Sequence, residues 1–328
     1  MALSDEYIDA HTLKWQRHLS QSYYKFRVKW PSRAFRHDPI EAIALILNDD
    51  ELLSRNHSQG RRVLDIAAQD ILGNDDTAYN FVRLYFRPRT PTQYRIEGVM
   101  KPDEIKYNDQ APMLGMMVFD AKKLYTEEGV HFSNCNMQRR DKTIGDTENF
   151  FDTLDFKKIF HFGGINGDRS IIAKRCAEIL FPSPMLVSEY LTHVICRSVA
   201  ERETLLGELI PEAKEKWKDK IIISDDMKVF QRDYTYVEHV SLDQEGIVFQ
   251  LFPRRDRKNV SVKVSVIDLD SDVAIIDFAN GDMNARPQSS NKKWRIKKNI
   301  PLGHYMVEIL LEDRRSFRRL ISLENLPY

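Results

Sequence analysis

Alternation of apolar and polar residues predicts a strand that carries a carboxylate. In the stretch 174–182, period-two alternation places Glu178 on one face and both Ile179 and Phe181 on the other, and Pro182 ends the run. An ionised carboxylate is costly to bury without a partner. The pattern therefore predicts that Glu178 is either an ion-paired structural residue or a working group in a site.

A second strand is predicted over 81–91. Its apolar side chains alternate with a polar set formed by Arg83, Tyr85 and Arg87. Two guanidinium groups and a phenol on one face suit a phosphate-bearing ligand. A solvent-facing strand whose arginines serve solubility is the alternative.

The remaining pattern before residue 221 mixes helices and strands. Asp38 can cap a helix that has Pro39 at its first position and Glu41 in reach of the cap, and the apolar run to Leu47 continues it. A shorter helix is predicted over 63–72. Further strands are predicted over 113–119, 130–133 and 191–196, and further helices over 199–209 and 211–218.

From about Ile221 the pattern changes to short alternating strands. Seven are predicted, over 234–241, 246–252, 260–269, 273–278, 293–297, 303–311 and 316–322. Seven strands in roughly 100 residues, separated by short turns, are typical of an immunoglobulin-like β-sandwich. None of the three cysteines falls in this part, so the sandwich would have no disulfide.

Composition adds little about partners. The 328 residues contain 49 Lys and Arg and 49 Asp and Glu, so the net charge favours neither a nucleic acid nor an acidic partner. Cys135, Cys176 and Cys196 form no metal-ligand spacing with histidine. No apolar run reaches membrane-spanning length, and the first residues lack the pattern of a signal peptide. We expect a soluble cytoplasmic protein without a metal site.

Local clustering is more informative than net charge. Residues 11–37 contain seven Lys or Arg, six aromatic residues including Trp30, and no acidic residue. Single-stranded nucleic acid is bound by such a mixture, because cations follow the phosphates and aromatic rings stack on bases. A basic helix whose aromatic residues belong to the core is the alternative. The long connection 133–170, with Asn136, Arg139 and Arg140, is predicted to be a substrate-facing loop or a surface excursion.

Taken together, these residues resemble the DarT family of NAD-dependent ADP-ribosyltransferases that modify bases of single-stranded nucleic acid. The specific matches are Tyr-Phe-Arg-Pro-Arg-Thr-Pro at 85–91 and Ala-Glu-Ile-Leu at 177–180, supported in order by 51–56, 130–136 and 150–156. The resemblance covers about residues 33–210. It implies an α+β ADP-ribosyltransferase fold with a split β-sheet core and helices, over 33–220, between an N-terminal extension (1–32) and the β-sandwich (221–328).

The resemblance also implies roles for single residues. Glu178 would be catalytic, because a carboxylate stabilises the oxocarbenium-like ribosyl cation formed when nicotinamide leaves. NAD, a substrate, would be bound by residues that match by position, namely Arg36, His37, Asn56, Tyr85 and Arg87. Apart from the resemblance, the basic aromatic segment and the long connection lead us to expect that the nucleic acid contacts Trp30, Asn136, Arg139 and Arg140.

The family implies a toxin of a toxin–antitoxin or anti-phage system that acts on single-stranded DNA or RNA and has an antitoxin as partner. A catalytically lapsed nucleic-acid-binding protein, in which Glu178 is structural, is the alternative function. The sandwich could equally serve as a docking platform for a partner protein.

Overall fold

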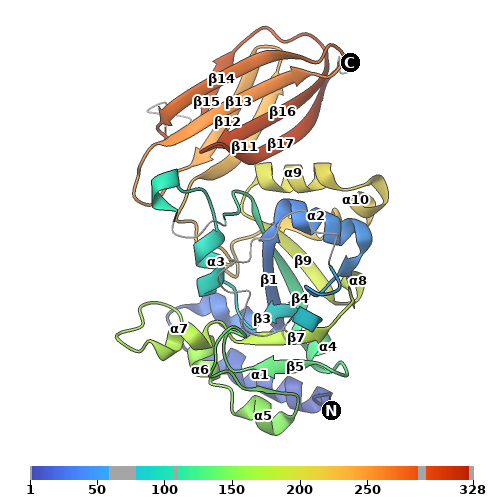
Figure 1. Cartoon of the computed structure of the whole chain (residues 1–328), viewed down its shortest axis with the longest axis vertical. Helices are drawn as coiled ribbons and strands as arrows, with labels where there is room; N and C mark the ends of the chain where they lie inside the picture. The colour runs from blue at the N-terminus through green and yellow to red at the C-terminus, as the bar shows by residue number, and fades with distance from the viewer. Residues whose placement is uncertain (1, 59–78, 106–109, 287–292, 325–328) are drawn as a thin grey trace.

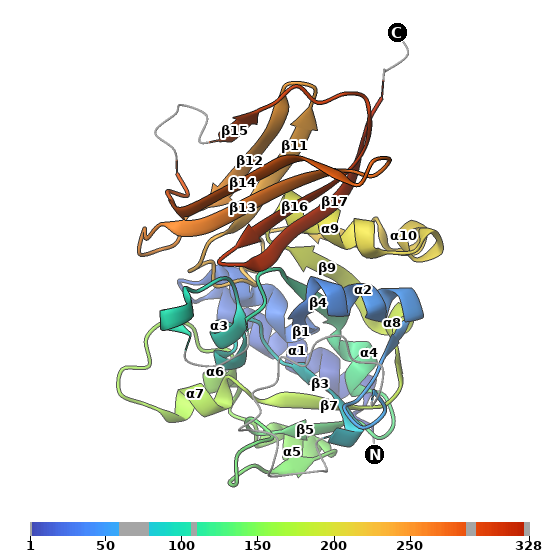
Figure 2. The same ribbon diagram turned by 45° about the horizontal axis from the view of Figure 1, so that its top comes forward.

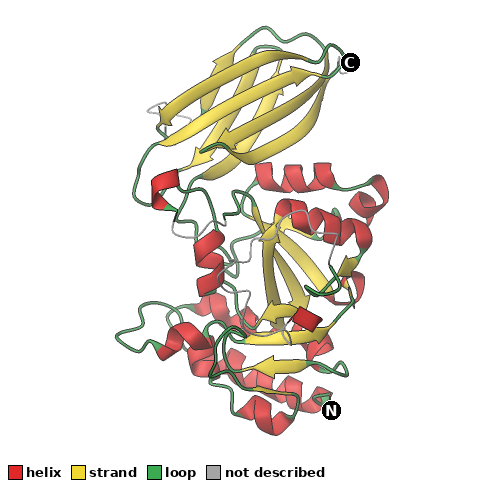
Figure 3. Cartoon of the chain, in the orientation of Figure 1, coloured by secondary structure: helices red, strands yellow, loops and turns green. Residues whose placement is uncertain are grey.

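The computed structural model describes residues 2–58, 79–105, 110–286 and 293–324. An α+β part and an all-β part follow one another along the long axis of the molecule (Figures 1 and 3). The predicted helix at 63–72 lies outside the described residues. Among the described residues, no helix is long and apolar enough to cross a membrane.

One mixed sheet organises the α+β part. In the order of pairing its strands are β10 (Ile221–Ile223), β9 (Leu191–Cys196), β4 (Leu114–Asp120), β1 (Arg33–Pro39), β3 (Phe81–Tyr85), β7 (Glu178–Pro182), β5 (His131–Ser133) and β6 (Ile144–Gly145). A two-stranded ribbon, β2 (Glu51–Leu52) with β8 (Met185–Leu186), lies beside it. The strands predicted at 113–119, 130–133 and 191–196 are confirmed within a residue or so.

The sheet comes close to splitting at its centre. β1 pairs with β4 over seven residues, whereas β1 and β3 pair only at Phe35 and Tyr85. Beyond that point a side chain replaces the backbone ladder, because Arg36 Nη1 donates to the carbonyl oxygen of Arg83 at 3.1 Å. Two four-stranded halves are thus joined at one register position, and side chains of both halves meet there.

Helices pack on both sides of this sheet. They are α1 (Asp5–Ser20), η1 (Lys25–Ser32), α2 (Ile40–Asp49), α3 (Pro91–Ile96), η4 (Pro102–Glu104), α4 (Ala121–Tyr125), α5 (Glu148–Asp152), α6 (Phe156–Ile159), α7 (Ser170–Lys174), α8 (Val187–Tyr190), α9 (Val199–Glu208) and α10 (Pro211–Trp217). The prediction that Asp38 caps α2 is wrong. The cap position is Pro39, and Asp38 lies one residue earlier on β1, where its carboxylate pairs with Arg36.

The basic N-terminal segment belongs to the core of the α+β part. Leu19 and Trp30 are buried in the same hydrophobic cluster as the strands. Trp15 lies 5.8 Å from Phe156 between ring centres, and Tyr24 lies 4.7 Å from Phe162. Most of the aromatic residues of this segment therefore pack in or against the core, as the alternative interpretation held, whereas Tyr23 is 92% exposed.

The C-terminal part consists of two antiparallel sheets, β11–β12–β15 and β14–β13–β16–β17, seen one behind the other in Figure 2. The seven predicted strands are all present, as β11 (Tyr236–Asp243), β12 (Gly246–Phe252), β13 (Val260–Asp268), β14 (Val273–Met283), β15 (Trp294–Lys297), β16 (Gly303–Leu311) and β17 (Arg314–Leu323). Inward side chains of both sheets form one hydrophobic cluster, because alternation gives each strand one apolar face.

α9 lies between the two parts (Figure 1) and contacts β11 and β17. Its start is held by a buried ionic network of Glu97, Arg197 and Glu201. Glu97 also accepts hydrogen bonds from the backbone N–H groups of Gln231 and Arg232, in the segment that leads to β11. The joint between the two parts is therefore polar, buried and specific.

Candidate active site

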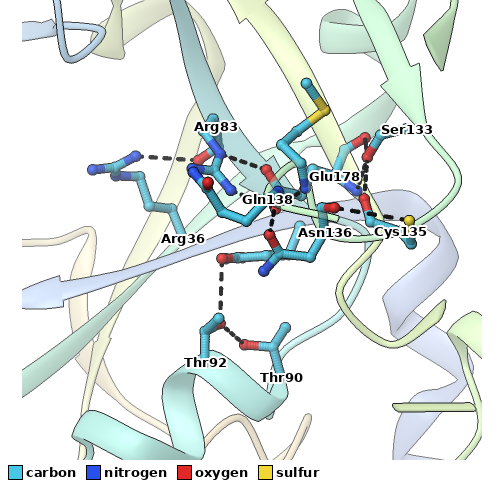
Figure 4. A network of polar contacts seen from close by, with 11 residues as sticks. Arg36, Arg83, Thr90, Thr92, Ser133, Cys135, Asn136, Gln138 and Glu178 are labelled. Atoms are coloured by element: carbon cyan, nitrogen blue, oxygen red, sulfur yellow. Dashed lines mark hydrogen bonds and ion pairs between the residues drawn. The ribbon is translucent and has the colours of Figure 1, made fainter. Parts of the chain in front are cut away.

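Glu178 begins β7 and is completely buried. It pairs in register with Tyr85 of β3, so both side chains lie on the same face of the sheet. The Arg83 guanidinium reaches diagonally across to it, with Nε 2.5 Å from Oε2 and Nη2 2.7 Å from Oε1 (Figure 4). The sequence left open whether Glu178 is an ion-paired structural residue or a working group in a site. The structure shows that it is ion-paired, which is compatible with either role.

A loop that follows β5 closes over the carboxylate. The backbone N–H of Met137 donates to Glu178 Oε1 at 3.4 Å, and the Glu178 backbone N–H donates to Ser133 Oγ at 3.0 Å. Figure 4 shows Asn136 and Gln138 beside the Arg83–Glu178 pair. The strand start and its side chain are thus both held by residues that lie about 40 positions earlier in the chain.

His37 and Tyr85 bring β1 into the same site. Their rings are stacked, with centres 5.5 Å apart and planes 10° from parallel. Burial, together with the charge of Arg36, lowers the pKa of His37 to about 3, so its imidazole is neutral at physiological pH. The Tyr85 hydroxyl accepts a hydrogen bond from Thr92 Oγ1 of α3 at 3.2 Å. His37, Tyr85 and Glu178 therefore lie on three adjacent strands, next to the place where the sheet opens.

Arg36 precedes His37 on β1, and its guanidinium is already paired with a carboxylate. Its Nε and Nη2 donate to the two carboxylate oxygens of Asp38, at 2.5 and 3.2 Å. Asn56 lies at the other end of β3, where its amide donates to Asn80 at 2.7 Å. Because Asn80 precedes Tyr85 by five residues, Asn56 is on the order of 15 Å from the row along the strand.

Arg87 does not share the face of Tyr85, so that prediction is wrong. β3 ends at Tyr85, and the following bend turns Arg87 into the core, where it is 2% exposed. Its Nε donates to the carbonyl oxygen of Pro88 at 2.9 Å and its Nη1 to that of Ile159 at 3.2 Å. Burial lowers the pKa of this guanidinium well below its usual value, helped by the charge of Arg175.

The prediction that Trp30 contacts nucleic acid does not agree with the structure either. Its side chain is fully buried, and its indole N–H donates to the carbonyl oxygen of Met227 at 3.1 Å. One face is covered by the guanidinium of Arg87, 4.9 Å from the ring centre. A ring in this position offers no surface on which a base can stack.

The other predicted nucleic-acid residues lie next to Glu178. Asn136 Oδ1 accepts the backbone N–H of Gln138 at 2.8 Å, which shapes the turn that carries Met137. Arg139 and Arg140 follow on the exposed side of this turn, and Arg139 pairs with Asp141 through two contacts of 2.7 Å. The loop thus links the buried carboxylate to an exposed basic tip.

Sequence reasoning missed two features of the site, the role of Arg83 as partner of Glu178 and the buried side chain of Gln138. Arg83 was recognised only as one cation on the polar face of its strand, because its partner is 95 residues away. Gln138 was not singled out at all, although its Oε1 is buried and finds no hydrogen-bond partner among the described residues. The described residues contain no group of three or more His, Cys, Asp or Glu side chains arranged to hold a metal ion.

Comparison with known proteins gives a family match over most of the α+β part. Residues 35–228, more than half of the chain, match the family described as ssDNA thymidine ADP-ribosyltransferase, DarT. A comparison with curated proteins finds no match.

Several solved structures are similar at low identity. DarT of Thermus sp. 2.9 in complex with ADP-ribosylated ssDNA is 17% identical with a TM-score of 0.49, over 60% of this chain and 96% of that one. The same protein in complex with NAD+ is also 17% identical, with a TM-score of 0.46, over 60% of this chain and 97% of that one. Thermosipho africanus DarTG in complex with ADP-ribose is 16% identical, with a TM-score of 0.42, over 67% of this chain and 55% of that one.

Proposed function

This chain belongs to the DarT family of single-stranded-DNA thymidine ADP-ribosyltransferases, and on that premise we propose that Glu178 is the residue on which its transfer of ADP-ribose from NAD depends. The observation that carries the proposal is the row of His37, Tyr85 and Glu178 on three adjacent strands at the opening of the sheet. All three strands fall almost entirely within the part that matches the family.

The role of Glu178 follows from the charge that develops on the ribose. When the bond between the ribose carbon and nicotinamide breaks, positive charge accumulates on the sugar before the bond to the acceptor base forms. A carboxylate fixed in a site away from water stabilises this charge without having to reorganise. Glu178 is buried, and both of its oxygens are held in place.

His37 and Tyr85 would bind the nicotinamide riboside half of NAD. A neutral imidazole can exchange hydrogen bonds with ribose hydroxyls, and the low pKa of His37 keeps it neutral. The Tyr85 ring, held by Thr92, offers a flat partner for the nicotinamide ring. Arg36 would contribute through its charge, and Asn56 would serve the far end of the dinucleotide.

The acceptor would approach from the loop that covers Glu178. Arg139 and Arg140 would contact phosphates of the strand, while Asn136 and Gln138 lie closer to the carboxylate and would face the base. The family description favours thymidine in single-stranded DNA over RNA.

The wider setting is proposed by analogy with relatives. The name DarTG of the Thermosipho africanus protein suggests an antitoxin partner for a toxin that acts in the cytoplasm. The two C-terminal sheets would form an immunoglobulin-like accessory domain that begins at β11. The boundaries expected near residues 32 and 220 do not agree with the fold, because Trp30 and Ile221 lie in the same hydrophobic core as the transferase strands.

The test uses NAD labelled in the adenosine half, with three oligonucleotides: single-stranded DNA with thymidine, the same DNA without thymidine, and RNA. Glu178→Gln keeps the size of the side chain and removes its charge. It should reduce labelling of the thymidine-containing DNA by about 100-fold or more. Glu215→Gln, at an exposed glutamate of α10, is the matched control and should be unaffected.

Label on the thymidine-containing DNA that persists in Glu178→Gln would contradict the role of Glu178. Label on RNA or on DNA without thymidine would contradict the proposed acceptor. Binding of DNA without any label from the unaltered protein would favour the catalytically lapsed alternative.

A further inference from the structure

We propose that Arg83 is a positioning residue for Glu178, an inference that rests on the proposed catalytic role of that glutamate. Arg83 contacts both carboxylate oxygens, at 2.5 and 2.7 Å, in a geometry that fixes the plane of the carboxylate as well as its position. The side chain of Glu178 is fully buried, whereas that of Arg83 is 25% exposed.

Arg83 is itself held from the other half of the sheet. Its carbonyl oxygen accepts from Arg36 Nη1, and Arg36 is fixed by two contacts to Asp38. A polar chain therefore runs from Asp38 through Arg36 and Arg83 to Glu178, across β1, β3 and β7. It crosses the sheet where the backbone ladder is interrupted, so it sets the position of Glu178 relative to His37 on β1.

The charge of Arg83 matters because several titratable groups near Glu178 are neutral. Burial raises the pKa of Tyr85 above its usual value, that of Cys176 to about 12, and that of Cys135 on the covering loop. His37, beyond Tyr85, is also uncharged. Arg83 thus supplies the positive charge in direct contact with the carboxylate.

The ion pair also favours the charged form of Arg83. Burial by itself lowers the pKa of Arg83, but the charge of Glu178 and the hydrogen bonds to it outweigh burial, so the net pKa lies above the ordinary value. Without the guanidinium, the fully buried carboxylate would lack its counter-charge, and an unpaired buried charge is costly.

A structural role alone and direct binding of NAD are the competing explanations. Loss of a purely structural pair would lower the amount of folded enzyme but not change the pH dependence of the remainder. A direct NAD ligand would raise KM. A positioning residue should lower kcat and change its pH dependence while KM for NAD stays the same.

The experiment measures kcat, KM for NAD and the pH profile of kcat on thymidine-containing single-stranded DNA, after far-UV circular dichroism has verified folding. Arg83→Met should lower kcat about 10- to 100-fold, the range seen when orienting partners of metal ligands are removed. The acidic limb of its kcat profile should move to higher pH, and KM should not change. Arg83→Lys, which keeps the charge but not the two-point contact, should fall between Arg83→Met and the unaltered enzyme.

Arg254→Met is the matched control, because it removes another largely buried arginine that pairs with a glutamate, Glu104, at the joint with the C-terminal sheets. Its kcat and pH profile should be those of the unaltered enzyme. If Arg83→Met does not fold, the kcat and pH profile of Arg83→Lys test the positioning role in its place.

Two results would overturn the inference: an unchanged kcat and pH profile in the Arg83 variants, or a rise in KM alone. Glu178→Gln measured alongside separates this failure from failure of the proposed function. Inactive Glu178→Gln with fully active Arg83 variants refutes only the positioning role, whereas active Glu178→Gln refutes the catalytic role on which it rests.

Discussion

Replacement of Arg197 by Met should strongly destabilise the joint between the two parts of the molecule. The Arg197 side chain is 1% exposed, its Nε donates to Glu201 Oε1 at 2.9 Å, and its backbone N–H donates to Oε2 at 2.9 Å. Glu97 lies 4.0 Å from Nη1 but keeps three other donors, from Gln93, Gln231 and Arg232. The substitution therefore deprives mainly Glu201 of its counter-charge.

The expected loss in the free energy of unfolding is about 3–5 kcal/mol, the cost of removing one partner of a buried ion pair. Burial already raises the pKa of Glu201, although the charge of Arg197 opposes this. A carboxyl group whose pKa is raised by folding loses stability as pH rises, because the unfolded chain ionises first. The deficit of Arg197→Met should thus be largest at neutral pH and shrink as pH falls toward about 4.5.

Urea unfolding followed by tryptophan fluorescence measures this loss, since Trp15, Trp30 and Trp217 all lie in the α+β part. Adding Glu201→Gln to Arg197→Met removes the uncompensated charge and should recover about 1 kcal/mol or more. The reasoning would be refuted by a loss below about 1 kcal/mol at neutral pH, or by a double variant less stable than the single one.

Three further predictions concern single residues. Gly246→Ala should destabilise the C-terminal part by about 1–3 kcal/mol in calorimetry, because φ is +132° and a Cβ would lie 2.0 Å from the carbonyl oxygen of Ile296; an unchanged Tm would contradict this. Burial lowers the pKa of His11 to about 4, so stability should fall by up to about 1.4 kcal/mol per unit as pH drops below 6.5, and His11→Phe should flatten that dependence in urea titrations. Trp30→Ala should cost about 3–5 kcal/mol of stability, yet leave the Kd of the folded protein for single-stranded DNA unchanged; a specific loss of affinity would restore Trp30 as a stacking residue.

Local pattern predicted most of the elements. The seven C-terminal strands and the strands β4, β5 and β9 follow from alternation, because a strand with one buried face must repeat with period two. The helices predicted at 199–209 and 211–218 are present as α9 and α10, and the structure shows Ser198 as the cap of α9 and Pro211 at the first position of α10. Where local signals competed, prediction failed: Asp38 has the chemistry of a cap but pairs with Arg36, and Arg87 continues an alternation that β3 no longer follows.

The candidate site, like the fold, was predicted only in part from the sequence. Glu178 stood out in the sequence because a lone carboxylate in an apolar strand requires an explanation, and the family resemblance gave it one. Its partner could not be inferred, since the contact with Arg83 depends on the register between β3 and β7, strands nearly 100 residues apart. The neutral state of His37 and the burial of Trp30 likewise depend on what surrounds them.

The sequence by itself determined most of the strands and which residue types carry chemistry, because those properties depend mainly on near neighbours along the chain. Only the tertiary structure decided that Arg83 holds Glu178, that β1 and β3 separate beside His37, and that Trp30 belongs to the core. Charge pairing, burial and strand register act through space, so residues far apart in the chain must first be brought together.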